Sequence, residues 1–235
     1  MKAFLKTSLF VLVLFLGVQA TAQNIIRPEG GEASFSIGVF GGSLSVNRES
    51  NAAKQIWADR LGADVITYGV GGAGFSSLQG HSIQRQVDSA GVHDVYVLWA
   101  STNDFVNSRE CGARTDTTAT TQCGGINYCI RTLLEKNPHA RIVFFTSLPF
   151  FGTESGHDPY STQTNSTGKT FAQYIEAQKE CCRQYAIPVL DQFSLCGFNE
   201  YNYGIYYLRD RLHMNEDGYR HIAPLQAAFL AGIVN

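Results

Sequence analysis

The chain has 235 residues, of which 18 are basic and 20 acidic, and its formal net charge is −2 at pH 7. A nearly neutral chain without a basic stripe lacks the charge that attracts nucleic acids or anionic membrane surfaces, so we expect neither as a partner. Its length favours one well-packed domain over two.

The N-terminus has the pattern of an export signal. Two lysines precede an apolar run at residues 9–18, and the small residues at 20–22 fit a cleavage site before Gln23. The apolar run is too short to cross a bilayer comfortably, and no run of membrane length follows it. We therefore expect a signal peptide at 1–22, a single domain at 23–235 without stable membrane insertion, and a periplasmic or extracellular location.

Strand-like and helix-like stretches alternate along the rest of the chain. The most convincing central strand is 95–100, which is apolar throughout, as strands buried on both faces are. Periodicity and capping residues predict the other elements. In chain order, we expect strand 34–40, helix 50–61, strand 64–68, helix 79–89, strand 95–100, helix 126–135, strand 141–147, a surface loop at 152–169, helix 171–185, strand 187–190 and a last helix from 216 towards 231, capped by Asn215.

This alternation predicts a three-layer α/β/α sandwich with a central parallel sheet of about five strands. Ligands of such sheets bind beyond the carboxyl ends of the strands. Ser43, Gly72 and Asn103 each follow a predicted strand. We therefore expect these three residues to meet at one rim of the sheet.

Ser43 comes directly after a predicted strand and two glycines. Glycine permits the positive φ angles and the close backbone approach that a tight turn needs, and such a turn would expose the hydroxyl. Taken alone, the segment also fits an ordinary Gly-Gly-Ser loop.

His213 has an acidic residue, Asp210, three positions before it. At this spacing the carboxylate can accept the imidazole Nδ1–H, which leaves Nε2 free to take a proton from a nucleophile. A serine, a histidine and an aspartate are the minimum set that makes an alcohol nucleophilic at neutral pH. The alternative is a surface ion pair, in which Arg209 or Arg211 competes for Asp210.

Two further segments contain candidate donors to an oxyanion. Asn103 follows the central strand, and its amide is a suitable donor, as is the backbone N–H of Gly72 in a glycine-rich stretch. The alternatives are an Asn-Asp turn and a plain flexible loop.

The six cysteines all lie in the expected mature domain. An even number in an exported chain favours at least one disulfide, and 15 connectivities are open. Their spacing matches no zinc pattern. We expect no metal or organic cofactor, and the sequence leaves the oligomeric state open.

The order of these motifs resembles the SGNH (GDSL-like) hydrolase family, with Asp210-Arg-Leu-His213 in the most specific block. The resemblance implies a flavodoxin-like sheet, Ser43 as nucleophile, His213 as general base and Asp210 as its orienting partner. It also implies an oxyanion hole from the Ser43 N–H, the Gly72 N–H and the Asn103 side chain. Two positions depart from the family pattern. Gly42 replaces the usual aspartate before the serine, and Ser101 replaces a glycine, which we expect to narrow the site.

The leading hypothesis is an exported serine esterase that cleaves small acyl esters, foremost acetyl groups on carbohydrate, through an acyl-enzyme at Ser43. Its partner is then a small-molecule or carbohydrate ester. Two alternatives stay open, namely a non-catalytic carbohydrate-binding relative and an acyltransferase that uses the same residues. The tyrosines in 201–207 could form a sugar-stacking wall, or simply pack in the core and rim.

Overall fold

The computed structural model describes residues 24–152 and 162–234. The expected signal peptide at 1–22 lies outside the described residues, as does part of the predicted surface loop at 152–169.

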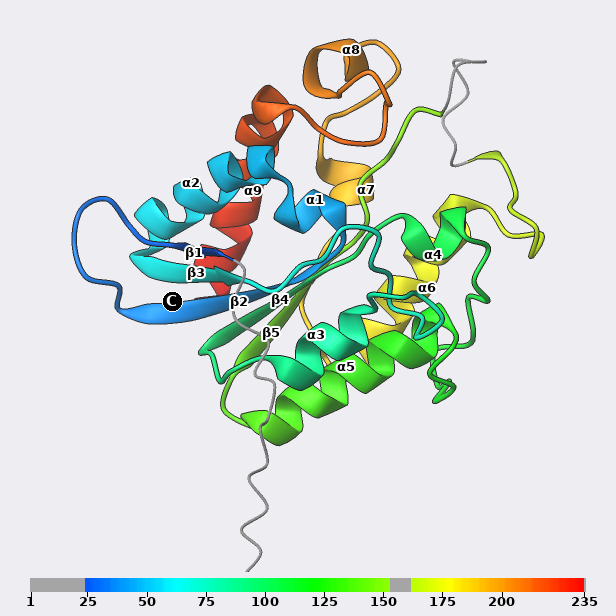
Figure 1. Cartoon of the computed structure of the whole chain (residues 1–235), viewed down its shortest axis with the longest axis horizontal. Helices are drawn as coiled ribbons and strands as arrows, with labels where there is room; N and C mark the ends of the chain where they lie inside the picture. The colour runs from blue at the N-terminus through cyan, green and yellow to red at the C-terminus, as the bar shows by residue number, and fades with distance from the viewer. Residues whose placement is uncertain (1–23, 153–161, 235) are drawn as a thin grey trace, which may run out of the picture.

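A six-stranded sheet in the order β1-β3-β2-β4-β5-β6 forms the centre of the molecule (Figure 1). Strands β3, β2, β4, β5 and β6 pair in parallel, and β1 pairs antiparallel with β3 at the edge of the sheet. The five parallel strands confirm the predicted sheet. The strands are β1 (Asn24–Ile26), β2 (Phe35–Gly41), β3 (Ala63–Thr67), β4 (Val95–Trp99), β5 (Arg141–Phe145) and β6 (Val189–Leu190).

Helices cover both faces of the sheet, with α2 and α9 on one side and α3, α5 and α6 on the other (Figure 1). The expected three-layer α/β/α sandwich is therefore confirmed. The helices are α1 (Ser43–Val46), α2 (Asn51–Leu61), α3 (Ile83–Ser89), α4 (Asn103–Val106), α5 (Gln122–Lys136), α6 (Phe171–Gln184), α7 (Gln192–Leu195), α8 (Tyr203–Tyr206) and α9 (Glu216–Val234), with a short 3₁₀ helix, η1 (Arg48–Ser50).

Strand β4 explains why the sheet has a core on each side. Val97 and Trp99 pack in the core beneath α2 and α9, whereas Tyr96 and Leu98 pack in the core beneath α3, α5 and α6. Successive side chains of a strand point to opposite faces, so a strand covered on both sides must be apolar at every position.

Local capping signals account for the helix ends that the sequence predicts well. Gly62 ends α2 in the left-handed conformation, with φ of 63°. Thr170 and Gln173 form a reciprocal capping box at the start of α6. Asn215 accepts the Gly218 N–H at 2.9 Å, and so caps α9 as expected.

Three features differ from the predictions. Helix α3 begins at Ile83 instead of residue 79, because the Ser82 side chain accepts the Arg85 N–H and caps the helix there. Helix α5 begins four residues early, at Gln122, and contains Gly124 and Gly125. Strand β1 was not predicted, since three residues are too few to show a period of two. Among the described residues, no helix is both long and apolar enough to cross a membrane.

Candidate active site

Ser43 is the first residue of α1 and follows the carboxyl end of β2. Gly42 precedes it with φ of −90°, so this glycine is not needed for a left-handed backbone. It is needed for space. A Cβ at Gly42 would lie 2.8 Å from the Ala73 carbonyl oxygen and 2.8 Å from the Ser101 Cβ. The missing side chain lets two neighbouring loops approach the turn that carries Ser43.

Ser43, His213 and Asp210 are joined by a continuous chain of hydrogen bonds. Ser43 Oγ lies 2.7 Å from His213 Nε2, and His213 Nδ1 lies 2.6 Å from Asp210 Oδ2. The other carboxylate oxygen, Oδ1, accepts the backbone N–H groups of Leu212 and His213, each at 3.0 Å. The structure thus brings the three predicted side chains together.

The surroundings of Asp210 keep it charged. Partial burial raises the pKa of this carboxyl, but the hydrogen bonds from His213 and Leu212 outweigh that effect and hold the pKa below its usual range. The carboxylate is still 47% exposed and His213 is 24% exposed, so both remain in contact with solvent.

The loop before α9 is held in a strained turn that presents His213. Arg211 adopts φ of 57°, a left-handed conformation that is uncommon for a residue with a side chain. The Leu208 N–H donates to the His213 carbonyl at 2.8 Å, and the Phe151 N–H donates to the Arg211 carbonyl at 3.0 Å. The Arg211 guanidinium lies 5.4 Å from the centre of the Tyr203 ring. Arg211 therefore packs on an aromatic ring. Among the described residues, Asp210 forms an ion pair with His213 and with neither Arg209 nor Arg211.

Asn103 is the first residue of α4, and its side chain reaches the turn that carries Ser43. Its Nδ2 donates to the Ala73 carbonyl at 2.9 Å and to Ser101 Oγ at 3.2 Å. The same nitrogen lies 3.1 Å from the position that a Cβ on Gly42 would take. The amide therefore sits directly beside the residue that precedes Ser43.

Gly72 occupies a turn after β3 with φ of 79°, which favours glycine. Its N–H has no hydrogen-bond acceptor within residues 24–152 and 162–234. The next residue, Ala73, supplies the carbonyl that contacts Asn103. The Gly72 N–H therefore lies one residue from the carbonyl that Asn103 contacts.

Asp104 is a buried structural residue to which the sequence analysis assigned no role of its own. It is 1% exposed, and its carboxylate accepts the N–H groups of Phe75 and Ser76 at 2.7 and 3.0 Å. A Cβ at Gly74 would lie 2.6 Å from Asp104 Oδ1, so glycine makes room for the carboxylate. Burial raises the pKa of Asp104 to about 6, although the two N–H bonds favour the charged form. Asp104 ties the loop of Gly72 to α4.

Lys54 and Tyr219 support α1 from behind. Lys54 is fully buried, and its Nζ donates to the Ser45 carbonyl at 3.0 Å and to Thr67 Oγ1 at 3.2 Å. Burial lowers the pKa of Lys54 to about 8. The Tyr219 hydroxyl donates to the Leu44 carbonyl at 2.9 Å. Carbonyls in so short a helix lack intrahelical partners, and these two side chains supply them.

The tyrosines before Asp210 serve mainly in packing. Tyr207 is 5% exposed, Tyr203 stacks on a phenylalanine with ring centroids 5.1 Å apart, and the Tyr206 ring lies 4.6 Å from the His221 ring. Tyr201 is 89% exposed. Only Tyr201 of these four is free of the packing contacts that the other three make.

All six cysteines are buried free thiols in this structure. No group of three or more His, Cys, Asp or Glu side chains is arranged to hold a metal ion in the described parts of the chain.

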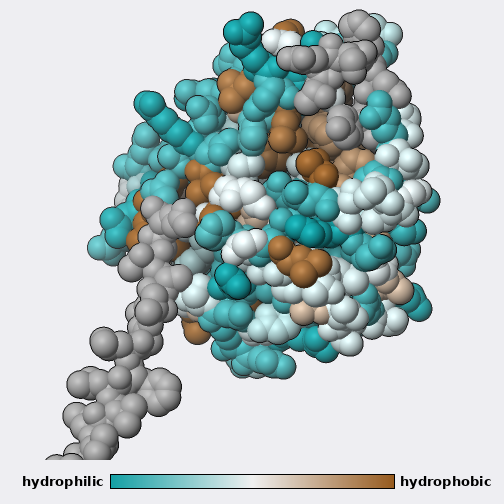
Figure 2. All heavy atoms as spheres, turned by 45° about the vertical axis from the view of Figure 1, so that its right-hand side comes forward, coloured by the Kyte–Doolittle hydropathy of each residue, from teal (hydrophilic) through white to brown (hydrophobic). Residues whose placement is uncertain are grey.

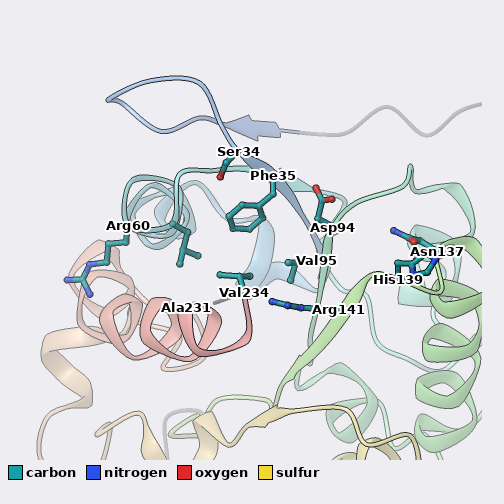
Figure 3. Close-up of a pocket in the computed structure, with 11 residues that line it drawn as sticks. Ser34, Phe35, Arg60, Asp94, Val95, Asn137, His139, Arg141, Ala231 and Val234 are labelled. Carbon is teal, nitrogen blue, oxygen red and sulfur yellow. Dashed lines mark hydrogen bonds between the residues drawn. The ribbon is translucent and has the colours of Figure 1, made fainter.

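A cavity of about 530 Å³ lies at the amino ends of the parallel strands, at the end of the sheet away from Ser43 (Figure 3). Its lining includes Phe35, Val95 and Arg141, which are the first residues of β2, β4 and β5. Ser43 follows the other end of β2. The cavity is therefore separate from the hydrogen-bonded residues described above.

Comparison with known proteins finds a protein family and solved structures that resemble this chain. The profile of the GDSL-like Lipase/Acylhydrolase family matches residues 34–221. None of the curated proteins compared with the chain matches it. One solved crystal structure is 27% identical over 86% of this chain and 98% of its own, with a TM-score of 0.77.

Two more distant structures share the fold. A possible lipase from Chitinophaga pinensis is 20% identical over 85% of this chain and 99% of its own, with a TM-score of 0.66. A carbohydrate acetylesterase from Sinorhizobium meliloti is 14% identical over 84% and 99%, with a TM-score of 0.56. Because the family profile spans most of the chain and these structures share its fold, the chain belongs to the SGNH (GDSL-like lipase/acylhydrolase) family.

Proposed function

We propose that this protein is an exported serine esterase that removes small acyl groups, foremost acetyl, from carbohydrate esters. The observation that carries the proposal is the unbroken line of hydrogen bonds from Ser43 through His213 to Asp210, at 2.7 and 2.6 Å. It is the arrangement that lets an imidazole take the proton of a hydroxyl as that hydroxyl attacks a carbonyl carbon.

In this mechanism, Ser43 Oγ attacks the acyl carbon while its proton passes to His213 Nε2. The C–O bond of the ester then breaks, and the leaving alcohol takes that proton from His213. Water then attacks the acyl-Ser43 carbon and gives a proton to Nε2. As the bond from that carbon to Ser43 Oγ breaks, Nε2 passes the proton to Oγ, which releases the acid and restores Ser43 and neutral His213. Asp210 accepts the Nδ1–H throughout, so that Nε2 always faces the serine.

Charge develops on the carbonyl oxygen in both tetrahedral intermediates. We assign three donors to it, namely the backbone N–H groups of Ser43 and Gly72 and the Nδ2 amide of Asn103. The N–H of Ser43 is the first in its helix and has no intrahelical acceptor. Donors of this kind are worth about 3 kcal/mol each in comparable sites.

Two observations favour a small acyl group on a carbohydrate. Figure 2 shows brown apolar patches among teal and white residues on one face. After residue 22, the sequence has no long apolar segment of the kind that covers a long acyl chain. The carbohydrate acetylesterase from S. meliloti has the same fold. Export rests on the pattern of residues 1–22.

The test uses p-nitrophenyl acetate and p-nitrophenyl octanoate with the wild type, Ser43→Ala and His213→Ala. We expect the wild type to prefer acetate and both variants to fall to background, with unchanged circular dichroism. Activity in Ser43→Ala would exclude the nucleophile assignment, and a preference for octanoate would exclude the acetyl assignment.

Covalent labelling separates the alternatives. A fluorophosphonate probe should react at Ser43, whereas a non-catalytic carbohydrate-binding protein would stay unlabelled. Acetylated sugars, supplied with and without an acceptor alcohol, then distinguish release of acetate from transfer of the acetyl group.

A further inference from the structure

The Ser101 side chain fills the space that a side chain at position 42 would need. A Cβ on Gly42 would come within 2.8 Å of the Ser101 Cβ, closer than real Cβ atoms approach another heavy atom. Ser101 follows β4, and it is 5% exposed. Its side chain is thus packed behind the nucleophile turn, and does not narrow an open site as the sequence suggested.

The Ser101 hydroxyl uses its full hydrogen-bonding capacity at this position. It donates its proton to the Ala73 carbonyl at 2.6 Å. It accepts the Asn103 backbone N–H at 3.3 Å and the Asn103 Nδ2 amide at 3.2 Å. A hydroxyl has one proton and two lone pairs, so all are engaged.

These bonds decide which end of the Asn103 amide faces Gly42. Ser101 Oγ has already given its proton to Ala73, so both oxygens present only lone pairs to the amide. If the amide were flipped, its own carbonyl oxygen would face two acceptors, which is unfavourable. The nitrogen end is therefore held towards Ser101 and Ala73, next to the nucleophile turn.

The same geometry leaves one amide proton available. Ala73 O, Ser101 Oγ and Asn103 Nδ2 form a tight triangle with sides of 2.6, 2.9 and 3.2 Å. The two oxygens are too close together for the two diverging protons of an amide to point at one each. One shared proton serves both oxygens, and the second is free to bind an oxyanion.

We propose that Ser101 is a positioning residue that orients the Asn103 amide for the oxyanion, in space that Gly42 leaves free. This inference rests on the proposed function of Ser43 and Asn103. In this proposal Ser101 does not contact the substrate. The residue acts through Asn103.

A double-mutant cycle tests this dependence, with kcat for p-nitrophenyl acetate measured for Ser101→Ala, Asn103→Ala and the double variant. We expect Ser101→Ala to lower kcat by about tenfold or more, with KM little changed. In the Asn103→Ala background the same substitution should change kcat less than about twofold, because its target is gone. Equal losses in both backgrounds, or no loss at all, would overturn the proposal.

Controls separate this outcome from a failure of the proposed function. Activity that survives in Ser43→Ala would refute the esterase mechanism itself, whatever Ser101 does. Ser34→Ala removes a serine-to-carbonyl hydrogen bond at the far end of the sheet, and should retain full activity. If Ser101→Ala does not fold, Ser101→Cys keeps the bulk with a weaker donor and takes its place in the cycle.

A second cycle tests the steric relationship by thermal unfolding. Gly42→Ala should lower Tm strongly when Ser101 is present and less strongly in the Ser101→Gly background. Some loss should remain there, since the Ala73 carbonyl is also 2.8 Å away. An identical drop in both backgrounds would show that Ser101 does not occupy the space of a side chain at 42.

Discussion

Ser43 Oγ and His213 Nε2 lie 2.7 Å apart, although 170 positions separate the two residues in the chain. The contact joins the end of β2 to the loop before α9. Both partners are anchored by backbone contacts, Ser43 through α1 and His213 through the turn at Arg211. A hydrogen bond held from two sides in this way needs little reorganisation before proton transfer.

Asp210→Asn tests whether the carboxylate sets the imidazole tautomer. An amide at 210 can donate to Nδ1, which would move the ring proton to Nε2 and block proton transfer from Ser43. We expect kcat to fall by about 10²- to 10⁴-fold on p-nitrophenyl acetate, with little change in KM. Asp217→Asn, an exposed change in the first turn of α9, is the control and should keep its activity. Equal activity of the two variants would contradict this role for Asp210.

Asp104→Asn should change how stability depends on pH. The pKa of Asp104 in the folded protein is about 6, above its ordinary value of 3.8. The folded chain therefore binds this proton more tightly than the unfolded chain does. The resulting stabilisation is complete below about pH 4 and is lost as the pH rises through 6.

Urea unfolding between pH 4 and pH 7 measures this effect. The wild type should lose up to about 3 kcal/mol relative to Asp104→Asn over that range. Asp59→Asn also neutralises a carboxylate that accepts a backbone N–H, but at the surface, and serves as the control. Parallel curves for the wild type and Asp104→Asn would contradict the raised pKa.

Comparison with Lys54→Met should show that the wild type becomes more stable as the pH rises in the alkaline range, the opposite of the effect of Asp104. Burial lowers the pKa of Lys54 from 10.5 to about 8, so the folded chain releases this proton before the unfolded chain does. The charged amine costs stability below about pH 8, and the cost disappears as the pH rises towards 10.5. Urea unfolding from pH 7 to pH 10 should show the wild type gaining about 2–3 kcal/mol relative to Lys54→Met. An identical slope for both proteins would exclude a lowered pKa.

Thr170→Ala removes the capping box of α6. The substitution leaves a first-turn N–H without its side-chain acceptor, and should destabilise the protein by about 1 kcal/mol. For a domain of this size, we expect Tm to fall by about 2–4 °C. Thr115→Ala, at an exposed loop position, is the matched control and should leave Tm unchanged. Esterase activity at 25 °C should be equal in both variants.

Local signals explain which parts of the fold the sequence predicts. The apolar run of β4 requires cover on both faces, and Gly62, Thr170 and Asn215 mark helix ends by their own side chains or backbone freedom. These signals act within a few residues, so they are readable without tertiary context. The spacing of Asp210 and His213 is of the same local kind.

Other features depend on contacts between distant segments. Gly124 and Gly125 suggest a loop, yet they lie inside α5. These positions are glycines because side chains there would collide with the backbone of Thr118 and Phe75. Likewise, Gly42 is explained by the Ala73 carbonyl and the Ser101 side chain, which come from two other loops. The burial of Asp104 depends on a glycine thirty residues earlier, and no periodic pattern reports such a pair.

Helix α9 both packs against the sheet's helical cover and supports the helix that begins with Ser43. Helix α9 packs against α2, and Tyr219 within it donates to the carbonyl of Leu44 in the helix that begins with Ser43. His213 stands just before this helix. The proposed general base and this support of α1 therefore both come from one short stretch, residues 213–219. A chain without that stretch would lose both contacts at once, the imidazole beside Ser43 and the hydrogen bond that holds α1.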